Sequence, residues 1–512
     1  MSISVNKQMQ LKSSARALFS LPNPKALLAG GVALLLLSAC SVGPDFVRPE
    51  APKVQHYNHG GDPAKMVAVE GVSQQFTEGV GPAANWWHLF HSAQLDRAVT
   101  EALAENPGLQ AAEAALRQSQ DNLRAGSGIF YPQLSATFSQ NREKNSPATI
   151  GSSAPSTIFN VTTLSSSVSY ALDLFGGERR TVEGLGAQVD QERALTLGTY
   201  MVLTGNIVNT CIAIAAYHDE IEAVEQLIAL QRDQLSIAEK QYQAGLTRYG
   251  ALLTLRSQLE SLASSLPPLQ QQLSQAEHLL ATLEGKNTAE FQPPHLTLKE
   301  IALPAELPLS LPSELVRQRP DILAAEARLH AASAGIGVAT AALFPSFTLN
   351  ATYGQSSQLM GSLFDSKSSV WGLGANVAAP IFNGGTLSAR RKAAMAAYDQ
   401  SFALYRQTVL AAFAQVADLV RALEHDAEVT AIDARALKDA ELSLDLIKVN
   451  YRAGMVNYLQ VIIADMQYRQ SRVSYLQAQA RQLQDTTALF VALGGGWPQD
   501  REAQKKADLQ HH

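Results

Sequence analysis

The longest regular pattern in the chain is a pair of helical tracts that are nearly free of proline. They run from Gly177 to Gly245 and from Gly384 to Gly454, and each would form one helix of roughly 100 Å at about 1.5 Å per residue. Apolar residues recur every seven positions in both tracts, which predicts left-handed coiled-coil packing. The repeated positions are Ile221, Ile228, Leu235 and Tyr242 in the first tract and Leu437, Leu444 and Tyr451 in the second.

Each tract is expected to turn back on itself at its closing glycine. Gly245 and Gly454 can adopt the left-handed conformation that ends many helices, because glycine has no Cβ. A returning helix should follow each glycine. The pair Pro267-Pro268 must interrupt the first of these returning helices.

In each half of the chain, two segments of about ten residues alternate apolar side chains with small polar ones. A loop rich in Ser, Pro and Gly is expected between the first two, at 141–160. Such strands fit a transmembrane β-barrel, but alternation alone fits a soluble sheet with one wet face equally well. The apolar positions are Leu134, Ala136, Phe138, Val168, Tyr170, Leu172 and Leu174, and then Phe347, Leu349, Ala351, Tyr353, Trp371, Leu373, Ala375, Val377 and Ile381.

Four landmarks of the first half return in the same order about 210 residues later. A tandem duplication of this kind predicts a fold built of two similar halves. Because no reactive residues are duplicated with it, the repeat favours an architectural protein over an enzyme. The pairs are Asn106-Pro107-Gly108-Leu109 with Arg319-Pro320-Asp321-Ile322, Phe130-Tyr131-Pro132 with Leu343-Phe344-Pro345, Leu174-Phe175-Gly176-Gly177 with Ile381-Phe382-Asn383-Gly384, and Gln241-Tyr242-Gln243-Ala244-Gly245 with Asn450-Tyr451-Arg452-Ala453-Gly454.

The duplication also sets the expected domain organisation. We predict a first structural repeat at 85–297, with a β-hairpin at about 133–175 and a long helical hairpin at about 178–284. We predict a second structural repeat at 298–499, with a β-hairpin at about 346–382 and a long helical hairpin at about 386–493. A polar tail follows at 500–512.

The first 39 residues have the features of a targeting segment. A basic start is followed by an apolar run of about a dozen residues, which is too short to span a bilayer. The run ends in a pattern typical of a bacterial lipobox, so Cys40 is predicted to carry a lipid; a structural cysteine is the alternative. Ser41, in place of an aspartate, favours sorting to the outer membrane. We expect residues 40–84, rich in Pro, Gly and Val, to form a lipid-anchored extended arm.

A lipid anchor favours the membrane interpretation of the alternating strands. Four strands cannot close a membrane barrel, for which about eight are needed, and an open edge cannot face lipid. The chain must therefore oligomerise. A dimer would supply eight strands and a trimer twelve.

Charge and cysteine content narrow the partners. The formal net charge is −6, and the targeting segment holds four basic and no acidic residues, so the remainder is at −6 − 4 = −10. This charge argues against a nucleic-acid partner. Cys211 is the other cysteine, so an acylated Cys40 leaves no intramolecular disulfide, and Cys211 is expected to be a small core residue.

Catalytic, metal-binding and nucleotide-binding motifs are missing from the sequence, and the predicted cofactor content is none beyond the lipid on Cys40. His88 and His91 lie three residues apart, a spacing that fits surface or packing histidines better than a metal pair. The apolar segment from Met201 to Tyr217 contains Thr and Asn residues that are costly in hydrocarbon, so we expect a helix packed among other helices.

Several motifs together carry a family resemblance. They resemble those of the outer membrane factors of the TolC type, most closely the NodT-type efflux lipoproteins, over the whole chain between the targeting segment and the tail. The motifs are Cys40-Ser41-Val42-Gly43-Pro44-Asp45-Phe46-Val47-Arg48-Pro49, Trp86-Trp87, Arg319-Pro320-Asp321-Ile322, Phe344-Pro345 and Ala492-Leu493-Gly494-Gly495-Gly496-Trp497.

The resemblance implies a mainly α-helical protein with a transmembrane β-barrel, assembled as a homotrimer with 12 strands in the outer membrane. It also implies a long periplasmic helical barrel and an equatorial girdle. Such a duct would dock onto a periplasmic adaptor protein and an inner-membrane pump of the RND or a similar type. Small toxic compounds or drugs would leave through it, and the partner pump would select them.

In the family, the helix turns would form the periplasmic tip, where the pore closes and the adaptor docks. Leu459 fits the hydrophobic ring of that gate, whereas Gln460 and Ile463 stand where relatives often place aspartates. Asp465 is the nearest acid, and a solvated or helix-paired carboxylate is the alternative to a role in the gate. Val456 stands where some relatives have a latching arginine. We therefore predict a gate that is mainly steric and apolar and that binds cations more weakly than an aspartate ring would. The tip and gate candidates are Gly245, Arg248, Tyr249, Gly454, Asn457, Tyr458, Leu459, Gln460, Ile463 and Asp465.

Two other classes of function stay open at this point. A lipid-anchored periplasmic enzyme would need a reactive cluster. A structural coiled-coil or adhesin-like outer membrane lipoprotein would use the long helices as a spacer, without transport, and would need no alternating strands.

Overall fold

The computed structural model describes residues 41–69, 71, 73–146, 151 and 155–495. The predicted signal peptide at 1–39, the predicted lipid site Cys40 and the predicted tail at 500–512 lie outside the described residues. The described chain divides into two compact units. The sheet unit comprises residues 41–45, 125–184 and 333–395, and the helical unit comprises 46–124, 185–332 and 396–495, apart from the undescribed positions.

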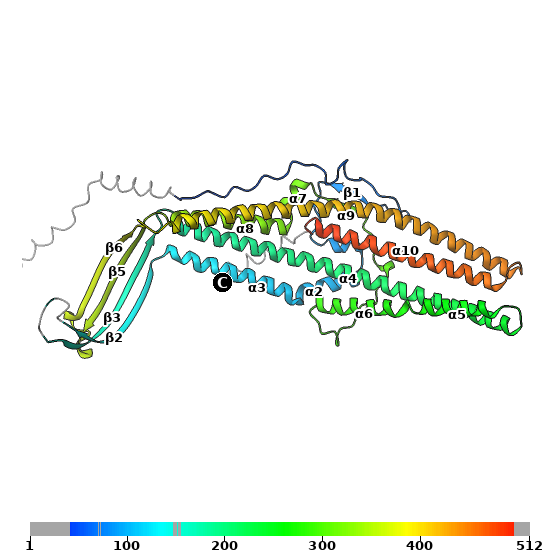
Figure 1. Ribbon diagram of the computed structural model, residues 1–512, viewed down its shortest axis with the longest axis horizontal. Coiled ribbons are helices and arrows are strands. Elements are labelled where there is room, and N and C mark those ends of the chain that lie inside the picture. Colours follow the sequence, from blue (N-terminus) through cyan, green and yellow to red (C-terminus); the bar gives the residue numbers. More distant parts are fainter. Residues whose placement is uncertain (1–40, 70, 72, 147–150, 152–154, 496–512) are drawn as a thin grey trace, which may run out of the picture. The chain divides into compact units, whose positions relative to one another are not determined.

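The sheet unit is built on four antiparallel strands in the order β2-β3-β5-β6 (Figure 1). Each repeat contributes one hairpin, and the hairpins join through β3 and β5. Within the described chain, β2 and β6 each have one unpaired edge. The strands are β2 Gln133–Asn145, β3 Thr157–Leu172, β5 Ser346–Ser357 and β6 Ser369–Ala378, with the short turns η5 Met360–Ser362 and η6 Ser366–Ser368 between the last two.

The first hairpin is longer than its hydrophobic pattern indicated. The predicted loop at 141–160 is too wide, because β2 continues to Asn145 and β3 begins at Thr157, where the two residues pair. The extensions carry mostly polar side chains, so they do not show the alternation of apolar and polar residues. They still pair, because the ladder is formed by backbone N–H and C=O groups. The second hairpin ends earlier than predicted, at Ala378, because Pro380 cannot donate to a ladder.

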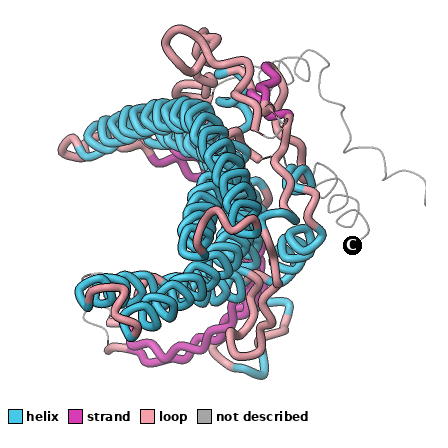
Figure 2. Tube along the Cα trace, turned by 90° about the vertical axis from the view of Figure 1, so that its right-hand side faces the viewer, coloured by secondary structure: helices cyan, strands magenta, loops and turns pink. Residues whose placement is uncertain are grey.

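The two longest helices, α4 Gly177–Gln243 and α9 Thr386–Arg452, each have 67 residues. Figure 2 shows the helices side by side in a curved layer. The return from α9 is one helix, whereas Pro267 and Pro268 open a second helix in the return from α4. The other helices are η1 Trp86–Phe90, α2 Ala93–Glu105, α3 Pro107–Ser127, η2 Gly128–Phe130, α5 Tyr249–Ala263, α6 Leu266–Leu283, η4 Leu298–Glu300, α7 Pro312–Gln318, α8 Pro320–Ala341 and α10 Tyr458–Ala492.

The two helical hairpins are in register with one another along the sequence. Adding 209 to the start of α4 gives the start of α9 (386 − 177), and adding 209 to the end of α6 gives the end of α10 (492 − 283). Every position of one hairpin therefore has a counterpart in the other. The two repeats can be compared residue by residue.

Each repeat fastens its returning helix with the residue that precedes a proline. Asn106 Nδ2 donates to the carbonyl oxygen of Leu283, the last residue of α6, at 2.8 Å. In the second repeat, Arg319 Nη1 donates to the carbonyl oxygen of Ala492, the last residue of α10, at 2.9 Å. These carbonyl groups have no partner inside their own helix, so both contacts act as C-terminal caps.

The core of the helical unit gathers around Trp86, which stacks on Phe490 of α10 with ring centroids 5.1 Å apart. The sequence did not predict the small parallel sheet beside this core, formed by β1 Gln75–Glu78 and β4 Glu306–Leu309. The expected arm is therefore tied into the body. Gln74, which is buried, also donates to Pro304 O at 3.0 Å.

One stretch of α4 is apolar and long enough to cross a membrane by composition, yet 72% of it is buried. Ile207 and Ile212, inside the segment that raised this question, have no exposed surface. The prediction of a helix packed among other helices is therefore confirmed. Cys211 is also fully buried, as expected, and burial and the nearby Glu284 raise the pKa of its thiol to about 12.

Candidate functional site

The turn after α4 is closed by backbone hydrogen bonds around Gly245. Its φ is 74°, in the left-handed region. Gly245 N donates to Tyr242 O at 2.9 Å and Leu246 N donates to Gln241 O at 2.8 Å. This pair of bonds satisfies carbonyl groups that the helix end leaves open.

The turn after α9 repeats this geometry. Gly454 has a φ of 73°, its N–H donates to Tyr451 O at 2.9 Å, and Met455 N donates to Asn450 O at 2.9 Å. The predicted left-handed helix ends are therefore confirmed at both glycines. Their role as a periplasmic tip stays a prediction.

A tyrosine pair braces each turn. The rings of Tyr242 and Tyr249 lie 5.5 Å apart, and those of Tyr451 and Tyr458 lie at the same distance. Tyr249 and Tyr458 were predicted as tip residues, but their contact with the heptad tyrosine was not. The signal was present, because the two tyrosines of each pair are seven residues apart and flank the turn.

The two turns differ in how the next helix begins. Asn457 Oδ1 accepts a hydrogen bond from Gln460 N at 3.1 Å and so caps α10. Its counterpart Arg248 precedes α5 without a side-chain cap. Arg256 of α5 instead reaches back to Glu239 of α4, at 2.8 Å.

The gate candidates Leu459 and Ile463 lie on one face of α10, since four residues separate them. Leu459 is half-buried and Ile463 is 52% exposed, whereas Val461 and Ile462 face inward and are buried. The counterparts in α5 are Gly250 and Thr254 (459 − 209 and 463 − 209), and neither is a large apolar residue. At these two positions the large apolar side chains belong to the second repeat alone, although the turn after α4 carries Leu246, which is 79% exposed.

Asp465 takes part in helix packing. Its Oδ1 lies 3.0 Å from Arg469 Nε on the same helix, and the side chains are 15% and 21% exposed. Arg469 also donates to Gln226 of α4. The carboxylate is therefore committed to an ion pair, as expected for a helix-paired residue, and Gln460 beside the turn is exposed and uncharged.

The residues that follow Cys40 are held tightly in the sheet unit. Val42 N donates to Phe175 O at 3.1 Å. A Cβ on Gly176 would come within 2.6 Å of Ser41 Oγ, and one on Gly43 within 2.5 Å of the Gly337 Cα. Cys40 itself lies outside the described residues, but its neighbour has a defined place beside the start of α4.

Ion pairs of Arg180 complete this attachment: the arginine is buried, whereas its partner Asp45 is 90% exposed. Arg180 is 5% exposed, and its guanidinium donates to Asp45 at 2.5 Å and to Glu183 at 2.7 Å. These acceptors raise the pKa of Arg180 against the opposing effect of burial, which is the largest single influence. The arm is therefore fastened by both close packing and charge.

Two carboxyl groups face each other between α9 and α10. Burial is the main cause that raises the pKa of Asp426 to about 7, and Asp485 adds to the effect. Arg481 and His425 oppose it. The counterparts of the two acids in the first repeat are Tyr217 and Ala276 (426 − 209 and 485 − 209), so the pair belongs to the second repeat alone.

Among the described residues, no group of three or more His, Cys, Asp or Glu side chains is arranged to hold a metal ion. His88 pairs with Asp96 at 2.8 Å. His91 ends the short helix η1 in the left-handed conformation. The two histidines thus have separate structural settings.

Comparison with known proteins places the chain in context. The sequence profile described as "Outer membrane efflux protein" matches residues 98–286 and 311–495. The pyoverdine export outer membrane protein OpmQ of Pseudomonas aeruginosa is 30% identical over 431 residues, covering 83% of this chain and 90% of OpmQ. The cation efflux system protein CusC of Escherichia coli O6:H1 is 28% identical over 478 residues, covering 93% of this chain and 100% of CusC.

Solved structures agree with these relatives. The outer-membrane channel OprN superposes with a TM-score of 0.78 at 25% identity, covering 90% of this chain and 100% of that one. The Campylobacter jejuni CmeC outer membrane channel has a TM-score of 0.79 at 20% identity, covering 92% of this chain and 98% of that one, which speaks for the fold alone. The proteins this chain resembles are transport channels.

Proposed function

From the premise that this chain belongs to the outer membrane efflux protein family, we propose that three copies of it form the exit duct of a tripartite export system. The chain is an outer membrane efflux channel, and its family is one of channels and not of enzymes. We assign it no catalytic role and no cofactor. The trimer, its 12-stranded barrel and its gate are the finer parts of the proposal.

The observation that carries the oligomeric assembly is the pair of open edges on the sheet, and the family resemblance supplies the number three. The edges of β2 and β6 have no partner in the described chain. Unpaired N–H and C=O groups are costly in a bilayer, so strands there must close into a barrel. Three sheets of four strands, joined β6 to β2, would leave no edge.

The long helices supply the periplasmic part of the duct. Each 67-residue helix spans roughly 100 Å, which exceeds the bilayer several-fold. We propose that the turns at Gly245 and Gly454 meet a periplasmic adaptor, and through it an inner-membrane pump of the RND or a similar type. Relatives are named for pyoverdine, cation and antibiotic export, so the partner pump is the natural source of substrate choice.

We propose that the gate at the tip is steric and apolar. Leu459 and Ile463 supply the bulk, and the nearest acid, Asp465, is neutralised by Arg469. An aspartate ring would bind multivalent cations strongly, whereas this arrangement has little free negative charge to offer. Single-channel recording tests this: block by trivalent cations from the periplasmic side should be weak, and strong block would refute the apolar gate.

Oligomeric state and conductance test the duct itself. Extracted in mild detergent, the protein should run as a trimer and open pores in planar bilayers. A structural or adhesin-like lipoprotein would give no pores, so a trimer without conductance would favour that alternative. Deletion of the gene should also sensitise cells to compounds that the partner pump carries.

The anchor is the last part of the proposal. We propose that Cys40 carries a covalent lipid that fastens the arm to the outer membrane, next to the site where Ser41 packs on Gly176. Intact-mass measurement of the mature protein should show the added acyl groups. Cys40→Ala should remove them.

A further inference from the structure

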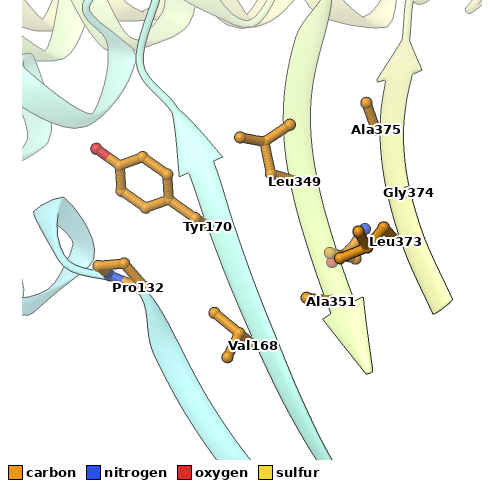
Figure 3. A pocket seen from close by; sticks show the side chains of 9 residues that line it. Pro132, Val168, Tyr170, Leu349, Ala351, Leu373, Gly374 and Ala375 are labelled. Atoms are coloured by element: carbon orange, nitrogen blue, oxygen red, sulfur yellow. The ribbon is translucent and has the colours of Figure 1, made fainter. Parts of the chain in front are cut away.

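One face of the sheet is hollowed near the ends of its strands that lead into the helices, as Figure 3 shows. The cavity has a volume of about 500 Å³. Six apolar side chains from two neighbouring rungs of the sheet define it, and we call it the notch. They are Tyr170, Leu349 and Ala375 in one rung and Val168, Ala351 and Leu373 in the next.

The hollow arises from a local change in side-chain size. Ala351 and Ala375 are small, while Leu349 and Leu373 stand beside them and are 42% and 78% exposed (Figure 3). Atoms that line an unfilled hollow lose their dispersion contacts on one side. A linear hydrocarbon chain would restore these contacts, because the notch runs across two rungs and is lined by no charged side chain.

The lipid-bearing end of the chain is close to the notch. Ser41 packs on Gly176, and Val42 N is bonded to Phe175 O. Tyr170 lies six residues before Gly176, so at about 3.3 Å per residue the two are at most roughly 20 Å apart. An acyl chain spans about half of the roughly 30 Å hydrocarbon core, or about 15 Å, which is a comparable length.

The segment that follows Cys40 is fixed by close packing. Gly43 has a φ of 96° and lies against Gly337, and a Cβ on Gly337 would come within 2.6 Å of Arg180 Cγ. Arg180 in turn holds Asp45. Residues 41–45 are thus held in place as far as Ser41, the residue that follows Cys40.

We propose that one acyl chain of the lipid on Cys40 lies in the notch of its own sheet; the inference rests on the proposed lipidation of Cys40. The hydrophobic effect does not select this occupant, because membrane lipid tails are as apolar as the notch. The covalent link to Cys40 selects this occupant, since the link keeps the acyl chain at a high effective concentration near the notch. The anchor thereby becomes part of the packing of the sheet.

Site-specific photo-cross-linking tests the occupant. A diazirine amino acid replaces Leu373 in the full-length lipidated protein in native membranes, and in a matched control it replaces Trp371, on the same strand and face but outside the notch. After irradiation and trypsin digestion, position 373 should be linked to the N-terminal lipopeptide. The yield at position 371 should be lower by about tenfold, the factor that 1.4 kcal/mol of preference produces.

Two results would overturn the proposal. Cross-links from position 373 to unattached phospholipid or lipopolysaccharide alone would make the notch a site for bulk lipid. Equal lipopeptide yields at both positions would mean that the anchor moves freely over the sheet. The diazirine probe at position 373 in the Cys40→Ala variant, which carries no lipid, serves as the negative control.

A filled notch gives an independent test. Ala351→Phe should place a side chain where the acyl chain lies, so the cross-link at position 373 should disappear. Removing the lipid by Cys40→Ala should lower the dissociation temperature of the trimer in the parent protein but not in Ala351→Phe, because coupled sites do not act additively. Equal shifts in both backgrounds would contradict the proposal.

The failures of the two proposals are distinguishable. Unmodified Cys40 in the intact-mass spectrum would overturn the inference together with its premise. A lipidated trimer that conducts in planar bilayers but shows no cross-link from the notch would overturn the inference alone. A lipidated protein that is cross-linked as expected but forms no pores would overturn the duct and leave the notch in place.

Discussion

The two repeats place a cap at the same point and build it from different chemistry. In the first repeat a neutral Asn106 donates one hydrogen bond to the end of α6 and accepts one from Leu109 N at 2.9 Å. In the second repeat Arg319, 8% exposed, donates to Ala492 O at 2.9 Å and to Gln415 Oε1 at 2.6 Å. Duplicated geometry therefore did not require duplicated side chains, because any donor directed at the helix end can serve.

The difference extends along the whole second hairpin. Its interior holds the Asp426–Asp485 pair, and its turn carries the capping Asn457 and the apolar Leu459. The first hairpin has none of these at the matching positions. The second repeat therefore combines the common scaffold with the more specialised polar and apolar groups, which makes it the place to perturb.

The largest effect is expected from Arg319→Ala. It leaves neutral acceptors on α9 and α10 without their charged donor, and each unsatisfied buried acceptor costs about 1–3 kcal/mol. Thermal unfolding followed by circular dichroism measures the change. Arg319→Lys should rescue only part of it, since an ammonium cannot replace the planar guanidinium fork.

The matched change in the first repeat, Asn106→Ala, should cost about 1 kcal/mol, the usual value of a neutral cap. The same thermal measurement applies. Equal losses for Asn106→Ala and Arg319→Ala would show that the charge of the second cap adds nothing.

The second largest effect should be a dependence of the free energy of unfolding on pH. Because the folded pKa of Asp426 is raised to about 7 from 3.8, the folded state holds its proton more tightly than the unfolded state. The contribution of Asp426 to stability should therefore be greatest below about pH 4 and fall as pH rises towards 7. The fall should be on the order of 2 kcal/mol, since a pKa unit corresponds to about 1.4 kcal/mol and solvent screening at this partly buried site reduces the effect.

Asp426→Asn should flatten that part of the stability profile, measured as the unfolding midpoint at a series of pH values. Tyr217→Phe, at the matching position of the first repeat, should leave it unchanged. A profile that keeps its slope in Asp426→Asn would assign the dependence to other groups.

Gly245→Ala and Gly454→Ala should have smaller and equal effects. Each places a Cβ on a residue with a φ near 74°, which costs roughly 1 kcal/mol for an L-residue. A Cβ would meet no other atom at either position, so backbone strain is the main cost. Hydrogen exchange at the two turns measures it, and a clear inequality would reveal a difference that the described geometry does not contain.

The smallest effect concerns charge at the tip. Arg469→Gln removes the partner of Asp465 and should increase cation selectivity and block by trivalent cations by a small factor, because the acid remains largely covered. Arg256→Gln, at the position of the first repeat that matches Asp465, frees Glu239 of α4 and serves as the comparison. Unchanged block in Arg469→Gln would remove Asp465 from the gate.

Much of the architecture could be read from periodicity. The two long helices, their glycine ends, the break at Pro267 and the four strands follow from local rules of spacing and backbone freedom. The β1–β4 pairing could not be predicted, because each strand has four residues and its partner lies more than 200 positions away. The full length of the first hairpin was not predicted either, because its outer part carries polar side chains and pairs through the backbone alone.

The candidate sites divide in the same way. Leu459, Gln460 and Ile463 were identified from the sequence as tip residues, but whether they line a pore is still a prediction. The ion pair between Asp465 and Arg469 was found only in the structure, because it depends on how Arg469 packs against Gln226 of the neighbouring α4.

The duplicated plan of this protein follows from its amino-acid sequence, because helix ends, strand alternation and a lipobox are encoded in short stretches of chain. The folded structure was needed to see which side chains from distant segments meet. It paired Asp426 with Asp485, directed Arg319 at the end of α10, and placed Ser41 against Gly176 beside an apolar notch. The physical reason is that burial, hydrogen-bond partners and cavities are properties of packed segments, and packing joins residues that no local pattern connects.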